Sequence, residues 1–76
     1  MNNNRRKRLQ QLKDKLLDLQ TEIEEIKDEE QDAYDNLPES LQDSERGEAI
    51  SEAIDNLDSA YNSLDEVAEY IEEAMQ

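Results

Sequence analysis

Apolar residues recur three and four positions apart along two long stretches, and this spacing constrains the fold more than any other feature. The seam in the first stretch consists of Leu9, Leu12, Leu16, Leu19, Ile23, Ile26, Glu30, Ala33 and Leu37, in which only Glu30 is not apolar. This is the heptad pattern of a helix that packs lengthwise against one neighbour. The sequence therefore predicts a first helix over residues 5–36, behind a flexible arm of residues 1–4.

The second stretch carries a wider apolar stripe. Its seam consists of Ile50, Ile54, Leu57, Tyr61, Leu64, Ala68, Ile71 and Met75. Beside the seam runs an extra column, spaced by sevens, of Ala53, Ala60, Val67 and Ala74. Three apolar positions per heptad are more than one contact needs. The pattern predicts a second helix over residues 45–75 that touches two neighbours.

A break between the two helices is predicted at the only proline. Pro38 lacks an amide donor and disfavours helical geometry at Leu37, while Ser44 is suited to cap the second helix. A turn over 37–44 lets the helices fold back as an antiparallel, coiled-coil-like hairpin. Facing residues would have numbers that add to 80, as in Leu16 with Leu64. The fold class is all-α.

Charge favours the same hairpin. Residues 1–20 carry six basic and two acidic side chains, net +4, whereas residues 21–76 carry two basic and twenty acidic ones, net −18. An antiparallel arrangement brings the basic N-terminal end to the acidic C-terminal end, and we expect Arg6 near Glu72 and Lys13 near Asp65. A chain of 76 residues with one seam is marginal alone. We therefore expect a homodimeric four-helix bundle, with self-association through Ala53, Ala60, Val67 and Ala74.

Composition argues against an enzyme. The chain has no Cys and no His, and no glycine-rich phosphate loop, so common nucleophiles and acid–base groups are missing. Residues 28–39 match the oxygen positions of a calcium loop, but Ala33 stands where that loop needs glycine. We predict no catalytic residue, no cofactor and no metal site. Without a long apolar run or an export signal, a cytoplasmic protein that does not enter membranes is expected.

The acidic surface is the main candidate for function. A charge of −18 over a hairpin about 48 Å long gives one charge per about 2.7 Å, and a dimer about one per 1.3 Å. These values bracket the one per about 1.7 Å of duplex DNA, although a solubilising face would have the same density. The candidate partner-binding residues lie off both seams: Glu22, Glu25, Glu29, Asp32, Asp55, Asp58, Asp65, Glu66, Glu69 and Glu73. The predicted partner is a protein with a basic surface.

A basic cluster precedes the first seam. Arg5, Arg6, Lys7 and Arg8 would suit a phosphorylated ligand, but the acidic remainder of the chain repels nucleic acid and can neutralise the cluster. Binding of nucleic acid is therefore not expected. A role as a sponge for small phosphorylated ligands stays open as an alternative.

The segment Asn36–Gln42, NLPESLQ, is followed by Ser44–Ala49, SERGEA, and by a Glu-Ala-Ile-Asp-x-Leu run. In these residues the chain resembles short acidic proteins encoded by phages and mobile elements of Gram-positive bacteria. The resemblance implies a small accessory protein that blocks or sequesters a host factor.

Two functions from different classes follow. The first is a non-enzymatic interaction module, an inhibitor or nucleic-acid mimic acting on a nucleic-acid-binding or defence protein of a bacterial host. The second is a structural or assembly coiled coil of the scaffold type. Growth beyond dimers would favour the second.

Overall fold

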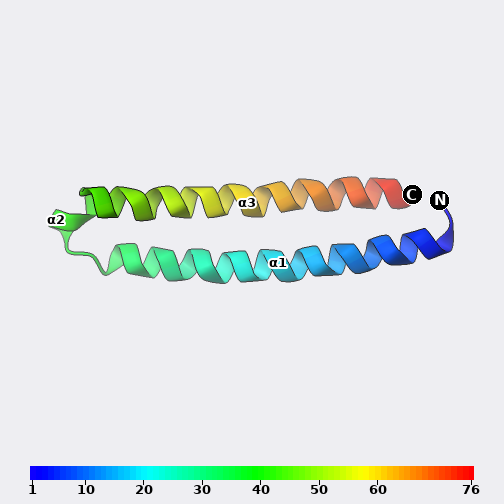
Figure 1. The fold of residues 1–76 in the computed structure, drawn as a ribbon, viewed down its shortest axis with the longest axis horizontal. Helices are drawn as coiled ribbons and strands as arrows, with labels where there is room; N and C mark the ends of the chain where they lie inside the picture. The colour runs from blue at the N-terminus through cyan, green and yellow to red at the C-terminus, as the bar shows by residue number, and fades with distance from the viewer.

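The computed structural model describes all of residues 1–76 as two long helices joined by a short one. Helix α1 spans Asn3–Asp35, α2 spans Glu39–Gln42 and α3 spans Glu45–Met75. α1 and α3 lie side by side in opposite directions, with both termini at one end and α2 at the other (Figure 1). The molecule measures 58 × 15 × 11 Å. The predicted all-α fold with two long packed helices is confirmed.

Both long helices begin at a polar capping residue. The Asn2 Oδ1 atom accepts a hydrogen bond from the Arg5 amide at 2.8 Å, and Ser44 Oγ accepts one from the Gly47 amide at 3.5 Å. Such caps satisfy first-turn amides that have no partner within the helix. The cap at Ser44 is the predicted one. The cap at Asn2 places Asn3 and Asn4 inside α1, so they are helical and do not belong to a flexible arm.

The turn contains α2, a single helical turn that the sequence did not predict. Its first bonds run from the Leu41 and Gln42 amides to the Pro38 carbonyl, at 2.8 and 3.2 Å. The Gln42 side chain then donates to the carbonyls of Tyr34 and Leu37, both at 3.3 Å. Carbonyls at a helix C-terminus lack partners within the helix. Gln42 supplies one here, which ties the end of α1 to the turn.

Gly47 is buried because α2 passes directly over the first turn of α3. A Cβ atom at this position would lie 2.7 Å from the Leu41 carbonyl oxygen and would overlap the Gln42 carbonyl group. Only glycine allows this approach. The predicted pairing, in which facing numbers add to 80, places Ala33 opposite Gly47. In the structure the groups closest to Gly47 are these two carbonyls of α2.

The face that α3 turns toward α1 is the predicted seam. All eight seam residues from Ile50 to Met75 are half-buried. In the extra column Ala53 is half-buried, and Ala60, Val67 and Ala74 are exposed. α3 therefore meets α1 with one part of its apolar stripe and leaves the rest uncovered.

The face that α1 turns toward α3 differs from the prediction. Leu9, Leu16 and Ile23 are half-buried as expected, but Leu12, Leu19 and Ile26 are 46%, 48% and 49% exposed. Their places in the contact are taken by a line of polar or partly polar side chains, each seven residues from the next: Arg6, Lys13, Gln20, Lys27 and Tyr34. α1 is thus rotated relative to the prediction, and the first four of these side chains reach polar groups of α3, which leucines cannot do.

The polar contacts between the helices also differ from the predicted ones. Polar contacts between the helices join residues whose numbers add to 81 or 85, not 80. Lys13 pairs with Glu72 at 3.6 Å and not with Asp65, and Arg6 bonds the carbonyl of Met75 and not Glu72.

The hairpin has no buried apolar core. Only Gln20 and Gly47 are buried, and no hydrophobic residue is. The accessible surface is 5818 Å², whereas a compact protein of 8.9 kDa exposes about 4,800 Å². The radius of gyration is 17.3 Å, against about 11 Å for a compact chain of this length. A single copy thus leaves about 1,000 Å² more surface in water than a compact fold would.

Candidate interaction site

Four polar side chains of α1 cross the helix contact and bind α3. We call them the polar ladder, and they are Arg6, Lys13, Gln20 and Lys27. Arg6 Nε donates to the Met75 carbonyl at 2.7 Å, and Lys13 Nζ lies 3.6 Å from Glu72 Oε2. Lys27 Nζ lies 3.1 Å from Asp58 Oδ1. Because exposed pairs of this kind contribute at most about 1 kcal/mol each, the polar ladder determines orientation more than stability.

Gln20 is the most buried member of the polar ladder, with 4% of its surface exposed. Its Nε2 atom donates to Asp65 Oδ1 at 2.7 Å and to the Tyr61 carbonyl at 3.1 Å. A bond to a charged acceptor is stronger than one between neutral groups. The sequence analysis missed Gln20. The one available signal was its place in a line of long polar residues at heptad spacing.

Lys27 is held in its charged form by the acidic groups around it. Its pKa lies above the ordinary 10.5, first because Nζ donates a hydrogen bond to Asp58. The second-largest influence is a loss of hydration, which lowers the pKa, and the negative charges of Asp58, Glu24 and Asp28 each raise it.

All ten carboxylates predicted to bind a partner are exposed. Two of them, Asp58 and Asp65, are occupied by Lys27 and Gln20 within the hairpin. The other eight carry no hydrogen bond or ion pair to another part of the chain: Glu22, Glu25, Glu29, Asp32, Asp55, Glu66, Glu69 and Glu73. Their spacing is helical on both helices, so Glu22, Glu25, Glu29 and Asp32 form one stripe along α1 and the other four form one stripe along α3.

The basic cluster is divided by the fold. Arg6 is half-buried and donates a hydrogen bond to the Met75 carbonyl at the C-terminal end of α3, and it forms no ion pair with the acidic residues there. Arg5, Lys7 and Arg8 are exposed and form no ion pair. Three positive charges at the open end of the hairpin therefore have no partner within the chain.

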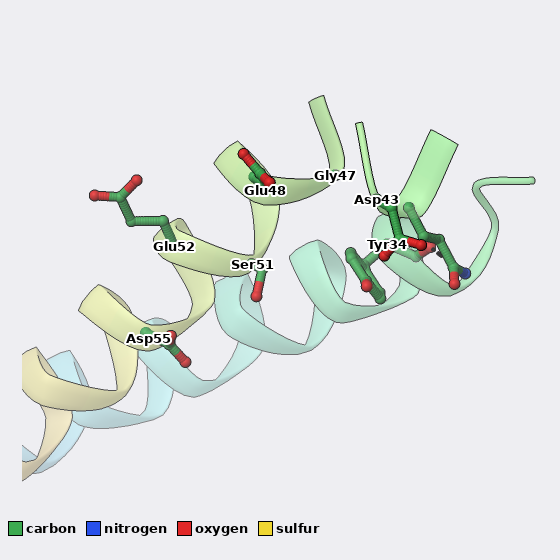
Figure 2. A pocket seen from close by; sticks show the side chains of 8 residues that line it. Tyr34, Asp43, Gly47, Glu48, Ser51, Glu52 and Asp55 are labelled. Atoms are coloured by element: carbon green, nitrogen blue, oxygen red, sulfur yellow. Dashed lines mark hydrogen bonds between the residues drawn. The ribbon is translucent and has the colours of Figure 1, made fainter. Parts of the chain in front are cut away.

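The largest hollow lies beside the turn and has a volume of about 400 Å³. Its lining includes Tyr34, Ser51 and four carboxylates, those of Asp43, Glu48, Glu52 and Asp55. Ser51 points toward α1 and Glu52 points away from it (Figure 2). No group of three or more acidic side chains is arranged to hold a metal ion.

No protein-family model matches the chain, and neither a curated protein nor a solved structure was found to be similar to it. No helix combines the length and the apolar character that crossing a bilayer requires.

Proposed function

We propose that this chain is a non-enzymatic interaction protein of the bacterial cytoplasm that binds a host protein through its acidic outer surface. In this proposal the partner is a nucleic-acid-binding or defence protein with a basic surface. The chain inhibits its partner by occupying the place of nucleic acid. The observation that supports this most is that eight of the ten candidate carboxylates face solvent with no partner in the hairpin.

Charge density supports a nucleic-acid mimic. The net charge of −14 along 58 Å corresponds to one negative charge per about 4 Å of length. Two copies side by side would carry one per about 2 Å, close to the one per about 1.7 Å of duplex DNA. The proposal therefore includes a homodimer, a four-helix bundle in which the column of Ala53, Ala60, Val67 and Ala74 lies at the contact.

A salt-dependent capture experiment tests the interaction. The chain is immobilised, a bacterial lysate is applied at low salt, and retained proteins are eluted with rising salt and, separately, with duplex DNA. Charge-driven complexes weaken steeply with ionic strength. We expect basic nucleic-acid-binding proteins to be retained and then released by both treatments. Retention that neither salt nor DNA reduces would contradict the proposal.

A matched pair of variants separates these residues from net charge. The first variant neutralises six of the unpaired carboxylates to Gln or Asn: Glu25, Asp32, Asp55, Glu66, Glu69 and Glu73. The control neutralises six other exposed carboxylates: Asp14, Asp18, Glu24, Asp28, Glu39 and Asp43. We expect the first variant to lose retention and the control to keep most of it, with equal helicity by circular dichroism. Equal losses would mean that net charge alone governs binding.

The second candidate function is a structural or assembly coiled coil. It is favoured by the exposed Leu12, Leu19 and Ile26, because such residues can join more than two copies. Sedimentation equilibrium distinguishes the two functions. A closed dimer supports the inhibitor, whereas continuous growth with concentration supports assembly.

A further inference from the structure

One side of the hairpin is apolar from end to end. On α1, two lines flank the half-buried Leu9, Leu16 and Ile23 on opposite sides. One is the polar ladder, and the other consists of Leu12, Leu19 and Ile26. On α3, the line of exposed small residues and the line of Asp58, Asp65 and Glu72 flank the seam in the same way. Because the polar ladder binds the latter line, the two apolar lines share the other side. This apolar face consists of Leu12, Leu19, Ile26, Ala33, Ala53, Ala60, Val67 and Ala74.

The apolar face is large enough to need a partner. Leu12, Leu19, Ile26 and Val67 are each between 43% and 49% exposed, although all belong to long helices in contact with each other. The excess surface of a single copy, about 1,000 Å², is similar to the roughly 800 Å² that each protein loses in a standard interface. One further helical layer would therefore cover it.

The charges beside the apolar face indicate which occupant fits. Next to the Leu12 line, on the side away from α3, lie Arg8, Lys15, Glu22 and Glu29, each seven residues from the next. All four are exposed and none forms an ion pair in the hairpin. The line thus changes from positive to negative along α1. If a second α1 lies antiparallel to the first, Arg8 faces the partner's Glu29 and Lys15 faces the partner's Glu22.

The apolar residues agree with the same alignment. The midpoint of the charge pairs falls beside residue 19, which places Leu19 against the partner's Leu19 and Leu12 against the partner's Ile26. A hollow of about 280 Å³ lined by Met1, Arg5, Arg8, Leu9 and Leu12 lies at the open end of this face. In this alignment the partner's α1 passes over that hollow beyond its Ile26.

The flank of α3 distinguishes this arrangement from the alternative. Next to its small-residue line, on the side away from α1, lie four uncharged residues, Ala49, Asn56, Ser63 and Tyr70. Two acidic helices can approach each other along an uncharged flank. In a bundle with both turns at the same end, α1 would instead lie against the partner's α3. Arg8, Lys15, Glu22 and Glu29 would then face uncharged residues and have no partners.

We propose that a second copy of the chain docks on the apolar face with its α1 antiparallel to this α1, about a two-fold axis at Leu19, and with the two turns at opposite ends. This inference rests on the self-association in the proposed function. It adds α1 to the contact and fixes how the copies are oriented. It also assigns Glu22 and Glu29 to the contact between copies, so the carboxylates that remain for the host protein are Glu25, Asp32, Asp55, Glu66, Glu69 and Glu73.

Cross-linking tests the axis, because the chain contains no cysteine of its own. The Leu19→Cys variant, treated with a short bis-maleimide, is expected to give a covalent dimer in high yield. Leu17→Cys is the matched control, since Leu17 is exposed but lies on the polar-ladder side of α1. If Leu19→Cys gives no more covalent dimer than Leu17→Cys, the proposed axis is wrong.

A charge exchange gives a second test that needs no cysteine. Glu22→Lys with Glu29→Lys should weaken dimerisation roughly tenfold or more, because four attractive pairs per dimer become repulsive. Adding Arg8→Glu and Lys15→Glu to the same chain should restore it. Failure of the second pair of changes to restore dimerisation would overturn the pairing, with circular dichroism used to verify helicity in each variant.

Sedimentation equilibrium of the unaltered chain separates the two levels of the proposal. If the chain is a dimer, a mixture of Leu19→Cys and Val67→Cys chains tests the other orientation. Cross-linking in that mixture, together with none for Leu19→Cys alone, would mean that the chain self-associates but that the proposed orientation is wrong. A helical monomer at every concentration overturns both, and assigns the apolar face to a different protein.

Discussion

The two long helices have nearly the same length, 33 and 31 residues, but they use their apolar residues in different ways. α3 packs its apolar seam against α1 and keeps its charges outside. α1 packs half of its apolar residues together with the polar ladder, and leaves Leu12, Leu19 and Ile26 in water. An apolar heptad therefore shows that a helix has a neighbour, but not which side of the apolar stripe the nearest neighbour covers.

The largest effect is expected where the turn sets the relative position of the two helices. Gly47→Ala should lower the free energy of unfolding by about 2–3 kcal/mol, because the new methyl group would collide with the Leu41 and Gln42 carbonyls. Helix propensity alone predicts the opposite sign, a gain of about 1 kcal/mol. Urea denaturation gives the answer, and a more stable variant would show that α2 can move aside.

The contrast between α1 and α3 can be measured with one substitution in each. In dilute solution Leu64→Ala should cost about 1–2 kcal/mol, and Leu19→Ala less than about 1 kcal/mol, because Leu64 is half-buried against α1 whereas Leu19 is 48% exposed. Thermal unfolding followed by circular dichroism is the measurement. Equal losses in dilute solution would contradict the rotated contact of α1. If a second copy covers Leu19, the difference between the stability losses of the two variants should become smaller as the protein concentration rises.

Gln20 tests whether the polar ladder or simple packing determines how α1 is rotated. Gln20→Ala should cost about 1 kcal/mol, since the hydrogen bonds to Asp65 and Tyr61 are lost. Gln20→Leu loses the same bonds but keeps the buried volume, so it should cost less. Chemical denaturation of both variants is the measurement. Equal losses would mean that the hydrogen bonds, which both variants lack, account for the contribution of Gln20, and a larger loss for the leucine variant would mean that an apolar side chain does not fit this position.

The smallest effect concerns the pH dependence of Lys27. Because its pKa is raised in the folded state, the stability it contributes is complete below pH 10.5 and is lost as the pH rises through the folded-state value. An NMR titration of the Lys27 side chain should give a midpoint above 10.5. Asp58→Asn should move this midpoint toward 10.5, whereas Asp55→Asn, which removes a carboxylate without a contact to Lys27, should not. Equal shifts in both variants would contradict the assigned hydrogen bond.

The sequence was sufficient to predict α3, its cap at Ser44 and its seam, since all eight residues of that seam are half-buried. On α1 two lines flank Leu9, Leu16 and Ile23, and the sequence analysis chose the line of leucines. The polar ladder faces α3 because its side chains are long enough to bind polar groups there. The heptad pattern contains no information about such contacts. The one-turn helix α2 was also missed, because its bonds depend on how Gln42 meets the end of α1.

The candidate carboxylates were correctly placed at the surface, but two of them bind within the hairpin. Asp58 and Asp65 were chosen because they lie off the predicted seams. Their partners, Lys27 and Gln20, could be identified only from the structure, because the sequence had not placed the polar ladder in the contact. The apolar column of α3 was identified from its spacing by sevens. The matching line on α1 was not, because the same leucines had been assigned to the contact within the chain.

The missing core also affects how the protein responds to temperature. The heat capacity change on unfolding grows with the apolar surface that becomes hydrated, and one hairpin shields no hydrophobic side chain completely. The stability curve of a single copy should consequently be shallow, with little tendency toward cold denaturation. Calorimetry at increasing concentration would then record a steeper curve only to the extent that association removes apolar surface from water.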